Sequence, residues 1–271
     1  MSELQPADYS MLDSPEITIR IFHPRPELHL SSETGANEVF IPVEDGIVIG
    51  ARFHPAGTEA PNILFFHGNG EIVADYDDLG HVYNRMGINF FPVDYRGYGR
   101  SGGEPSVSSM MRDCHTIYHF TRKWLSDNGY TGAFIVMGRS LGSASALELA
   151  STYEDRIDGL VIESGFALAE PLLRLLGIDL RSFDFSESKG FRNLDKIKQF
   201  HKPVFIIHAE FDHIIPYSDA LKFQQASPSP DKTLLKIPGA NHNDILSKGL
   251  TAYMAAVKSF TERLEVSRLT Q

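Results

Sequence analysis

Residues 134–150 read FIVMGRSLGSASALELA, and this stretch decides the fold. The apolar residues 134–137 predict a strand buried on both faces, and the small residues after Leu141 predict a helix that packs closely on a sheet. Between them, GRSLG fits the pattern G-x-S-x-G with Ser140 at its centre. In that pattern the serine occupies a strained strand-to-helix turn, which exposes its hydroxyl. We therefore predict that Ser140 is a nucleophile.

The rest of the chain repeats this strand-then-helix pattern. Short apolar runs bounded by turn residues predict buried strands at 63–67, 89–93, 133–137, 159–163, 203–208 and 233–237. Apolar residues at helical spacing predict helices at 79–86, 106–125, 141–150 and 246–266. Strands that alternate with helices form parallel β-α-β units. We therefore predict an α/β fold, in which helices cover both faces of a mostly parallel central sheet.

The N-terminal part of the chain departs from this pattern. Residues 38–42 and 47–54, joined by a turn at 44–46, predict an N-terminal antiparallel hairpin. We predict a single domain over residues 38–271, preceded by an extension, residues 1–37, that contains a strand at 17–22. A long leucine-containing insert at 166–200 separates two strands. Because loops after the strands of such sheets carry function, we predict that this insert is a small lid.

A serine hydroxyl needs a base to take its proton, usually a histidine that a carboxylate orients. In this strand-turn-helix context the chain order is Ser, then Asp or Glu, then His. Asp212 and His242 each follow a late strand in that order. Glu210 is the alternative acid, but it lies so close to the strand end that Asp212 is preferred.

Acyl transfer develops negative charge on the substrate oxygen, which backbone N–H groups must meet. One predicted donor is the N–H of Leu141, directly after the serine. The second is Asn69, with Gly70 as the next choice, in the loop His67-Gly68-Asn69-Gly70 after an early strand. We expect His67 to support this loop. Arg139 either meets an anionic part of the substrate or is an exposed turn residue, so Gly70 and Arg139 remain candidate substrate-binding residues.

Two further patterns suggest other chemistry and are set aside. GYGRSG at 97–102 matches the dinucleotide fingerprint G-x-G-x-x-G, but it follows no first strand and leads into no helix directly. His115 and His119 are four residues apart in a predicted helix, without the further ligands of a metal motif. We therefore predict no cofactor and no metal.

Composition limits the partners and the location. The formal net charge is −10 and basic residues do not cluster, which argues against a nucleic-acid partner. The single cysteine, Cys114, cannot form an internal disulfide and lies in an apolar helical pattern. No apolar run reaches 18 residues, and residues 1–12 lack a secretory pattern. We expect a cytoplasmic protein without a spanning membrane segment.

Together these motifs resemble the α/β-hydrolase superfamily. The resemblance covers roughly residues 38–262 and is carried by FHGNG (66–70), DYRGYGRS (94–101), GRSLG (138–142), IHAEFD (207–212) and GANHND (239–244). Within the superfamily the chain is similar to the small, thinly lidded members that include the depalmitoylating serine hydrolases, although Ala209 replaces a common glycine. The resemblance implies Ser140, Asp212 and His242 as the triad.

The expected activity is hydrolysis of a carboxylic ester or thioester through an acyl-enzyme, on a small-molecule or acyl-bearing substrate. The first alternative is a peptidase or amidase of the same fold. The second is a non-catalytic binding module, because a fold does not by itself imply activity. Loss of a triad residue would favour that second alternative, and all three are present.

Overall fold

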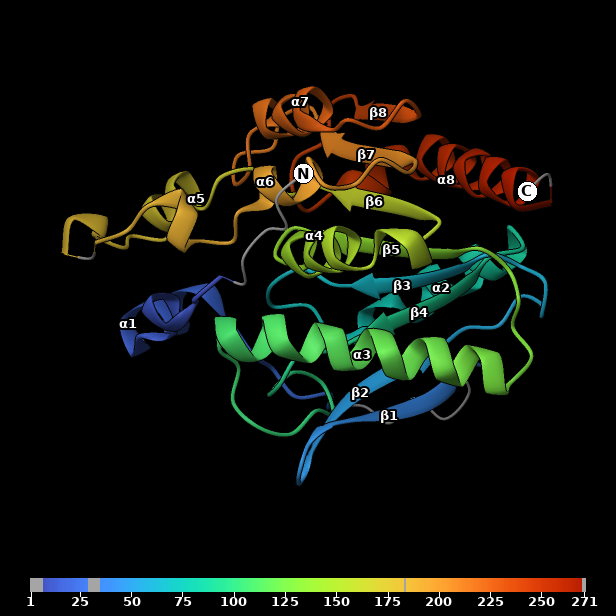
Figure 1. The fold of residues 1–271 in the computed structure, drawn as a ribbon, viewed down its shortest axis with the longest axis horizontal. Helices are drawn as coiled ribbons and strands as arrows, with labels where there is room; N and C mark the ends of the chain where they lie inside the picture. The colour runs from blue at the N-terminus through green and yellow to red at the C-terminus, as the bar shows by residue number, and fades with distance from the viewer. Residues whose placement is uncertain (1–6, 29–34, 183, 270–271) are drawn as a thin grey trace.

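The computed structural model describes residues 7–28, 35–182 and 184–269. Within them, eight strands form one sheet in the order β1-β2-β4-β3-β5-β6-β7-β8 (Figure 1). The strands are β1 Asn37–Glu44, β2 Ile47–Phe53, β3 Asn62–Phe66, β4 Asn89–Val93, β5 Phe134–Arg139, β6 Gly159–Glu163, β7 Val204–Ala209 and β8 Lys232–Ile237.

The pairing confirms the mostly parallel sheet and the N-terminal hairpin. β1 is antiparallel to β2, and β2 is antiparallel to β4. The remaining neighbours, from β4 through β3 to β8, are parallel. Parallel strands end at the same edge of the sheet, so the loops after β3, β5, β7 and β8 meet there. This edge is where the motifs identified in the sequence come together.

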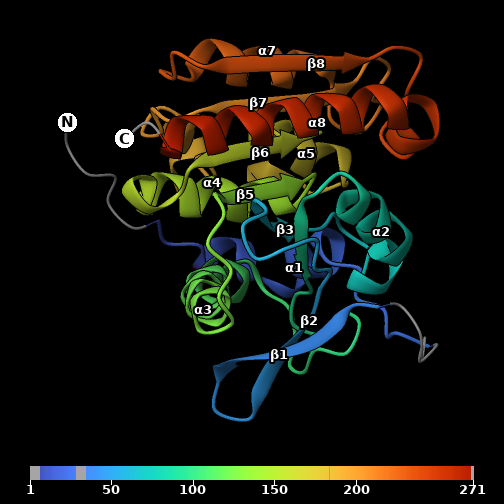
Figure 2. The same ribbon diagram turned by 90° about the vertical axis from the view of Figure 1, so that its right-hand side faces the viewer.

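Helices cover both faces, as predicted. They are α1 Pro15–Ile21, α2 Asp77–Arg85, α3 Val107–Asp127, α4 Gly142–Thr152, α5 Ala169–Leu175, α6 Asn193–Ile197, α7 Tyr217–Ala226 and α8 Ile245–Leu269, with short 3-10 helices η1 Ser10–Asp13, η2 Val73–Tyr76, η3 Glu154–Arg156, η4 Leu180–Ser182 and η5 Glu187–Lys189. Leu64 and Phe66 of β3 belong to the core with α3 and α4, whereas Ile63 and Phe65 belong to the core with α2 and α8. Figure 2 shows α3 and α4 on one side of the sheet and α2 on the other. None of the helices predicted from the sequence corresponds to α7.

The strand predicted at 17–22 is wrong, because α1 occupies Pro15–Ile21. Ile17, Ile19 and Ile21 alternate as they would in a strand, yet Ile19 is 73% exposed while Ile17 and Ile21 are buried. Two buried residues four positions apart define one face of a helix. Pro15 in the first turn also suits a helix start, where its missing N–H costs nothing.

The insert at 166–200 contains α5 and α6 and lies beyond the carboxyl ends of the strands. In Figure 1, α5 and α1 both project from that end of the molecule. Arg20 of α1 donates a hydrogen bond from Nη1 to the carbonyl of Leu176, just after α5, at 2.9 Å. The N-terminal segment and the insert are therefore joined.

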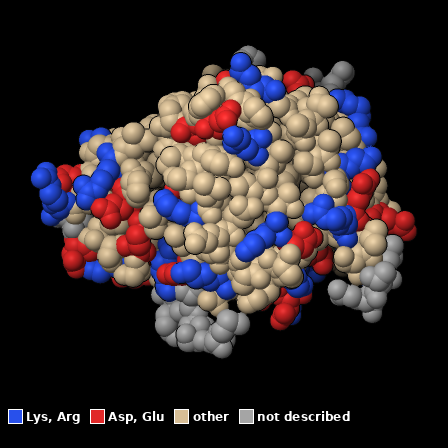
Figure 3. All heavy atoms as spheres, turned by 90° about the horizontal axis from the view of Figure 1, so that it is seen from above, with Lys and Arg blue, Asp and Glu red and all other residues tan. Residues whose placement is uncertain are grey.

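The surface carries mixed charge. On the face in Figure 3, Lys and Arg lie beside Asp and Glu, including at the end that carries α5. There Arg174 pairs with Glu170 and Arg181 with Asp179. None of the helices in the described ranges has the length and apolar character needed to cross a membrane.

Candidate active site

Ser140 lies on a tight turn between β5 and α4. Its φ of +51° is in the left-handed region, which a non-glycine residue rarely occupies and which costs energy. Neighbouring glycines make the turn possible: a Cβ on Gly138 would lie 2.2 Å from the Gly142 carbonyl oxygen, and one on Gly142 would lie 2.1 Å from that of Phe66. The backbone N–H of Ser140 donates to the Glu163 carbonyl at 2.9 Å, which fixes the turn to β6.

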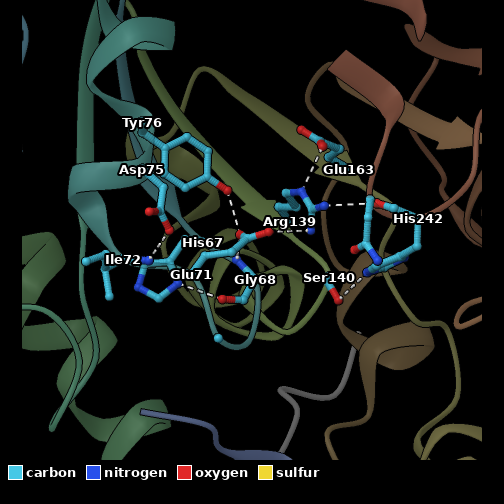
Figure 4. Close-up of polar contacts among 12 residues, drawn as sticks. His67, Gly68, Glu71, Ile72, Asp75, Tyr76, Arg139, Ser140, Glu163 and His242 are labelled. Carbon is cyan, nitrogen blue, oxygen red and sulfur yellow. Dashed lines mark hydrogen bonds and ion pairs between the residues drawn. The ribbon is translucent and has the colours of Figure 1, made fainter. Parts of the chain in front are cut away.

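The structure brings Ser140, His242 and Asp212 together from three loops. His242 Nε2 lies 3.0 Å from Ser140 Oγ, and His242 Nδ1 lies 2.7 Å from Asp212 Oδ2. Figure 4 shows the contact between the histidine and the serine. The other carboxylate oxygen of Asp212 accepts the backbone N–H groups of Ile214 and Ile215 at 3.0 and 2.8 Å. With the Nδ1 proton held by Asp212, the lone pair of Nε2 faces the serine hydroxyl.

The surroundings keep the carboxylate of Asp212 ionised. Burial alone would raise its pKa, but the hydrogen bonds from His242 and the two backbone N–H groups outweigh that effect and lower the pKa below its usual value. Asp212 and His242 are 8% and 4% exposed. An ionised, buried carboxylate can hold the imidazole in one orientation and stabilise its positive charge.

Two titratable residues near the triad, Glu210 and His208, lie in different contacts. Glu210, the alternative acid, pairs with Lys236 at 2.8 Å and accepts the Gly239 N–H at 3.0 Å. His208 is buried and its Nε2 is 2.8 Å from the Ile215 carbonyl oxygen. Burial lowers the pKa of His208, so this imidazole is neutral and supports the loop that carries Asp212.

The loop after β3 places Asn69 beside the serine. Asn69 and Leu141 line the same cavity as Ser140. Among the described residues, no protein group accepts the backbone N–H of either. His67 holds the base of the loop, with Nδ1 2.7 Å from the Gly68 carbonyl oxygen and Nε2 3.2 Å from Asp94. The Gly70 carbonyl accepts a hydrogen bond from Arg25 Nε at 2.7 Å.

Arg139 is the centre of a buried cluster behind the serine, and the alternative that it is an exposed turn residue is wrong. Its side chain is 11% exposed. Nη1 lies 3.0 Å from Glu71, Nε lies 3.2 Å from Glu163, and Nη2 donates to the His242 carbonyl at 2.9 Å (Figure 4). Burial would lower the pKa of the guanidinium, but the two carboxylates raise it above its usual value. A contact of Arg139 with substrate stays a prediction.

Two tyrosines complete this group, which we call the Arg139 cluster: Glu71, Tyr76, Arg139, Glu163 and Tyr253. Tyr76 donates to Glu71 Oε2 at 2.6 Å, and Tyr253 donates to Glu163 Oε2 at 2.7 Å. Glu71 also accepts the Gly68 N–H at 2.6 Å. The cluster thus links the loop after β3, the serine turn and the histidine loop. Neither glutamate was predicted from the sequence, although Glu163 ends an apolar strand and Glu71 follows a glycine-rich turn, positions typical of site residues.

A cavity of ≈ 190 Å³ opens onto Ser140. Its apolar lining comes from three segments: Ile21 of the N-terminal helix, residues of the predicted lid (Ala169, Leu172, Leu173, Leu176 and Phe191), and Ile214 after β7. Its polar lining includes Asn69, Glu71, Arg139, His242 and Asn243. The insert therefore contributes to the cavity, and so does α1, which the sequence analysis placed outside the recognisable domain.

The patterns set aside in the sequence have other roles. GYGRSG forms a turn, with the Gly97 N–H donating to the Gly102 carbonyl at 3.2 Å. A Cβ on Gly99 would lie 2.1 Å from Asp94, so close packing requires this glycine. His115 and His119 both contact the Tyr153 hydroxyl at 3.0 Å. Over residues 7–28, 35–182 and 184–269, no group of three or more His, Cys, Asp or Glu side chains is placed to hold a metal ion.

Known proteins share this fold. A family model described as "Serine aminopeptidase, S33" matches residues 58–181. Alpha/beta hydrolase domain-containing protein 17C of Xenopus tropicalis is 32% identical in an alignment of 205 residues, and the match covers 73% of this chain and 60% of that relative. The chain thus spans three fifths of the length of that relative.

Solved structures share the architecture. The esterase Pf2001 of Pyrococcus furiosus superposes with a TM-score of 0.71 at 18% identity, covering 89% of this chain and 98% of the esterase. Est1E of Butyrivibrio proteoclasticus, solved with ferulic acid bound, superposes with a TM-score of 0.68 at 19% identity. The superposition covers 84% of this chain and 99% of Est1E. The chain therefore belongs to the α/β-hydrolase superfamily, and its relatives there are hydrolases.

Proposed function

We propose that this protein is a serine hydrolase that cleaves a carboxylic ester or thioester through an acyl-enzyme. Ser140 is the nucleophile, His242 the general base and Asp212 the residue that orients the histidine. The observation that carries the proposal is the continuous hydrogen-bonded chain from Ser140 Oγ through His242 to Asp212, with Ser140 and His242 lining a cavity that is also lined by apolar side chains.

The mechanism follows from these contacts. Ser140 Oγ attacks the substrate carbonyl carbon while its proton moves to His242 Nε2. The N–H groups of Leu141 and Asn69 stabilise the oxyanion. His242 then protonates the departing oxygen or sulfur, which leaves the acyl group on Ser140. Water, activated by the same imidazole, releases the carboxylic acid and restores the serine.

The cavity favours an apolar acyl group. Its apolar lining would bury hydrocarbon, which stabilises binding by about 25 cal/mol per Å². The family description raises aminopeptidase activity as the alternative. An aminopeptidase must hold the substrate ammonium group. Among the described residues that line the cavity, the carboxylate is that of Glu71, which already pairs with Arg139 and Tyr76. We therefore place esters and thioesters before peptides.

The test is a panel of acyl esters, acyl thioesters and aminoacyl amides, with a fluorophosphonate probe on the same preparations. We expect the wild type to turn over esters or thioesters and to label at Ser140. Ser140→Ala should lose both turnover and label, because no other group supplies the nucleophile. Ser151→Ala, at the far end of α4, is the matched control and should keep both. Ester turnover that survives in Ser140→Ala would reject the proposal, and a wild type that neither labels nor turns over any substrate would favour a binding module.

A further inference from the structure

The N-terminal segment is anchored to the body of the protein independently of the active site. Leu12 and Ile17 are fully buried in the main core. Asp13 accepts the Ser108 N–H at the start of α3, at 3.0 Å. Tyr9 contacts the buried Lys196 at 3.1 Å. The segment therefore reaches the cavity from a fixed base.

After α1, the chain passes directly over the loop that carries Asn69. The His23 N–H donates to Asn69 Oδ1 at 2.9 Å, and Tyr98 donates to the same oxygen at 2.7 Å. Asn69 Nδ2 lies 2.7 Å from His23 Nδ1. Because the amide nitrogen only donates, Nδ1 of His23 must accept, so the ring bears no proton there. Both ends of the Asn69 side chain are thus held, and His23 provides two of the contacts.

The next residues of the segment hold the following part of the loop. Arg25 donates to the Gly70 carbonyl at 2.7 Å and pairs with Asp75. Its own backbone carbonyl accepts the Gly99 N–H at 2.9 Å. On its other side, the loop is held by Glu71 through the Gly68 N–H. The peptide of Asn69 therefore lies between two anchors, one in the N-terminal segment and one in the Arg139 cluster.

We propose that His23 is a positioning residue for the oxyanion hole, which fixes the Asn69 peptide through the Asn69 side chain. This inference rests on the proposed function, since the Asn69 N–H stabilises an oxyanion only if Ser140 is the nucleophile. A backbone donor is effective when its direction is set before the charge develops. The N-terminal segment thereby joins the active site, with Ile21 on the cavity wall and His23 behind the oxyanion donor.

The test compares three variants of the full chain on a p-nitrophenyl acyl ester. His23→Ala removes the Nδ1 acceptor and keeps the backbone N–H. His23→Asn places Oδ1 near the position of Nδ1 and should restore the contact. Ile19→Ala, on the exposed face of α1, is the control. Loss of a whole oxyanion donor lowers kcat by about 10²–10³, so we expect a loosened donor to lower it by about tenfold in His23→Ala, with KM within about twofold. The other two variants should stay within about twofold of the wild type.

A trifluoromethyl ketone with the same acyl group separates positioning from a general structural effect. Ser140 adds to its carbonyl carbon, the serine proton moves to His242, and the ketone oxygen becomes the oxyanion. His23→Ala should weaken this inhibitor by the same factor as kcat, with substrate KM unchanged. An unchanged kcat in His23→Ala, or inhibitor binding that does not follow kcat, would overturn the inference.

Hydrogen exchange keeps the two proposals distinguishable. The Gly68 and Glu71 N–H groups are hydrogen-bonded within the loop, and their exchange should accelerate in His23→Ala but not in His23→Asn or Ile19→Ala. If the wild type hydrolyses no ester, the proposed function fails. The exchange rates still decide whether His23 holds the loop, and equal rates in all variants would reject that.

Discussion

Two charged clusters in the interior of this protein consist of similar groups but have different roles. The Arg139 cluster links three loops at the active site. The second, which we call the Lys196 cluster, consists of Tyr9, His115, Glu148 and Lys196. There Lys196 Nζ lies 2.6 Å from Glu148, and Glu148 lies 3.4 Å from both His115 and Tyr9. It joins α6, α4, α3 and the N-terminal segment, on the helical layer and away from the serine.

The clusters differ in charge balance. Arg139 faces two carboxylates, whereas Lys196 faces one. In the proposed mechanism, the surplus negative charge near His242 would stabilise the imidazolium that forms when Ser140 attacks the substrate. The Lys196–Glu148 pair is balanced, and the imidazole beside it, that of His115, contacts the Tyr153 hydroxyl, so the pair holds one segment against another. We therefore expect substitutions in the first cluster to change catalysis and stability together, and those in the second to change stability alone.

The largest effect is expected for Arg139→Met. It leaves the buried Glu163 without a cation, removes the partner of the 25% exposed Glu71 and frees the His242 carbonyl. Breaking a buried ion pair by removing one partner costs about 3–5 kcal/mol, and we expect that loss in the free energy of unfolding. The kcat of the folded enzyme should fall at least about a hundredfold. Urea unfolding and ester kinetics measure the two. Arg139→Lys keeps the charge but cannot make three divergent contacts. Its unfolding free energy and its kcat should therefore lie between those of Arg139→Met and the wild type. A folded Arg139→Met with the kcat of the wild type would contradict a catalytic role for the Arg139 cluster.

A smaller loss, about 2–3 kcal/mol of unfolding free energy, is expected for Lys196→Met. It leaves Glu148 without its cation, but that carboxylate is 19% exposed and retains His115. Leu12 and Ile17 still anchor the N-terminal segment, so kcat should remain within about threefold. Lys198→Met, at an exposed pair with Asp195, is the control and should change neither quantity measurably. A tenfold loss of kcat in Lys196→Met would show that this cluster also serves catalysis.

Acid should destabilise the protein in part by protonating Glu148 of the Lys196 cluster. Burial would raise the pKa of Glu148, but His115 and Lys196 outweigh it and lower the pKa from 4.5 to about 2. The ionised carboxylate thus stabilises the fold above pH 4.5, and this contribution is lost as pH falls toward 2. Discounted for partial exposure, the loss is roughly 2 kcal/mol. Urea unfolding between pH 5 and pH 2.5 should show a shallower decline in Glu148→Gln than in the wild type. An equal decline of the unfolding free energy in Glu148→Gln and the wild type would contradict the assignment of this acid sensitivity to Glu148.

The smallest effect on stability is expected for Glu163→Gln. Burial raises the pKa of Glu163, so the ionised form is unfavourable in the folded state and weakens the fold as pH rises above the usual value. The neutral amide should therefore leave the free energy of unfolding unchanged at pH 8 or raise it by up to about 1 kcal/mol. It removes the surplus charge near His242, so kcat should fall severalfold. A kcat equal to that of the wild type would show that the surplus charge has no catalytic role.

Part of the fold could be read from the sequence because it depends on local patterns. The strands β3 to β7 are short apolar runs buried on both faces, and such runs are visible without knowing their neighbours. At 17–22 the apolar pattern led to a wrong prediction of a strand. The isoleucines at alternate positions there belong to a helix, and one of them is exposed to solvent. Which face of a segment is buried depends on what packs against it.

The sequence by itself determined the strand-turn-helix around Ser140 and the order of Asp212 and His242, because glycine spacing and chain order are local properties. Only the tertiary structure decided that Glu71 and Glu163 meet at Arg139, and that His23 and Ile21 reach the active site. These contacts join residues from 24 to 103 positions apart, as between Arg139 and Glu163 or Arg139 and His242. Such pairings are set by the common edge at which the parallel strands end, and no local pattern records them.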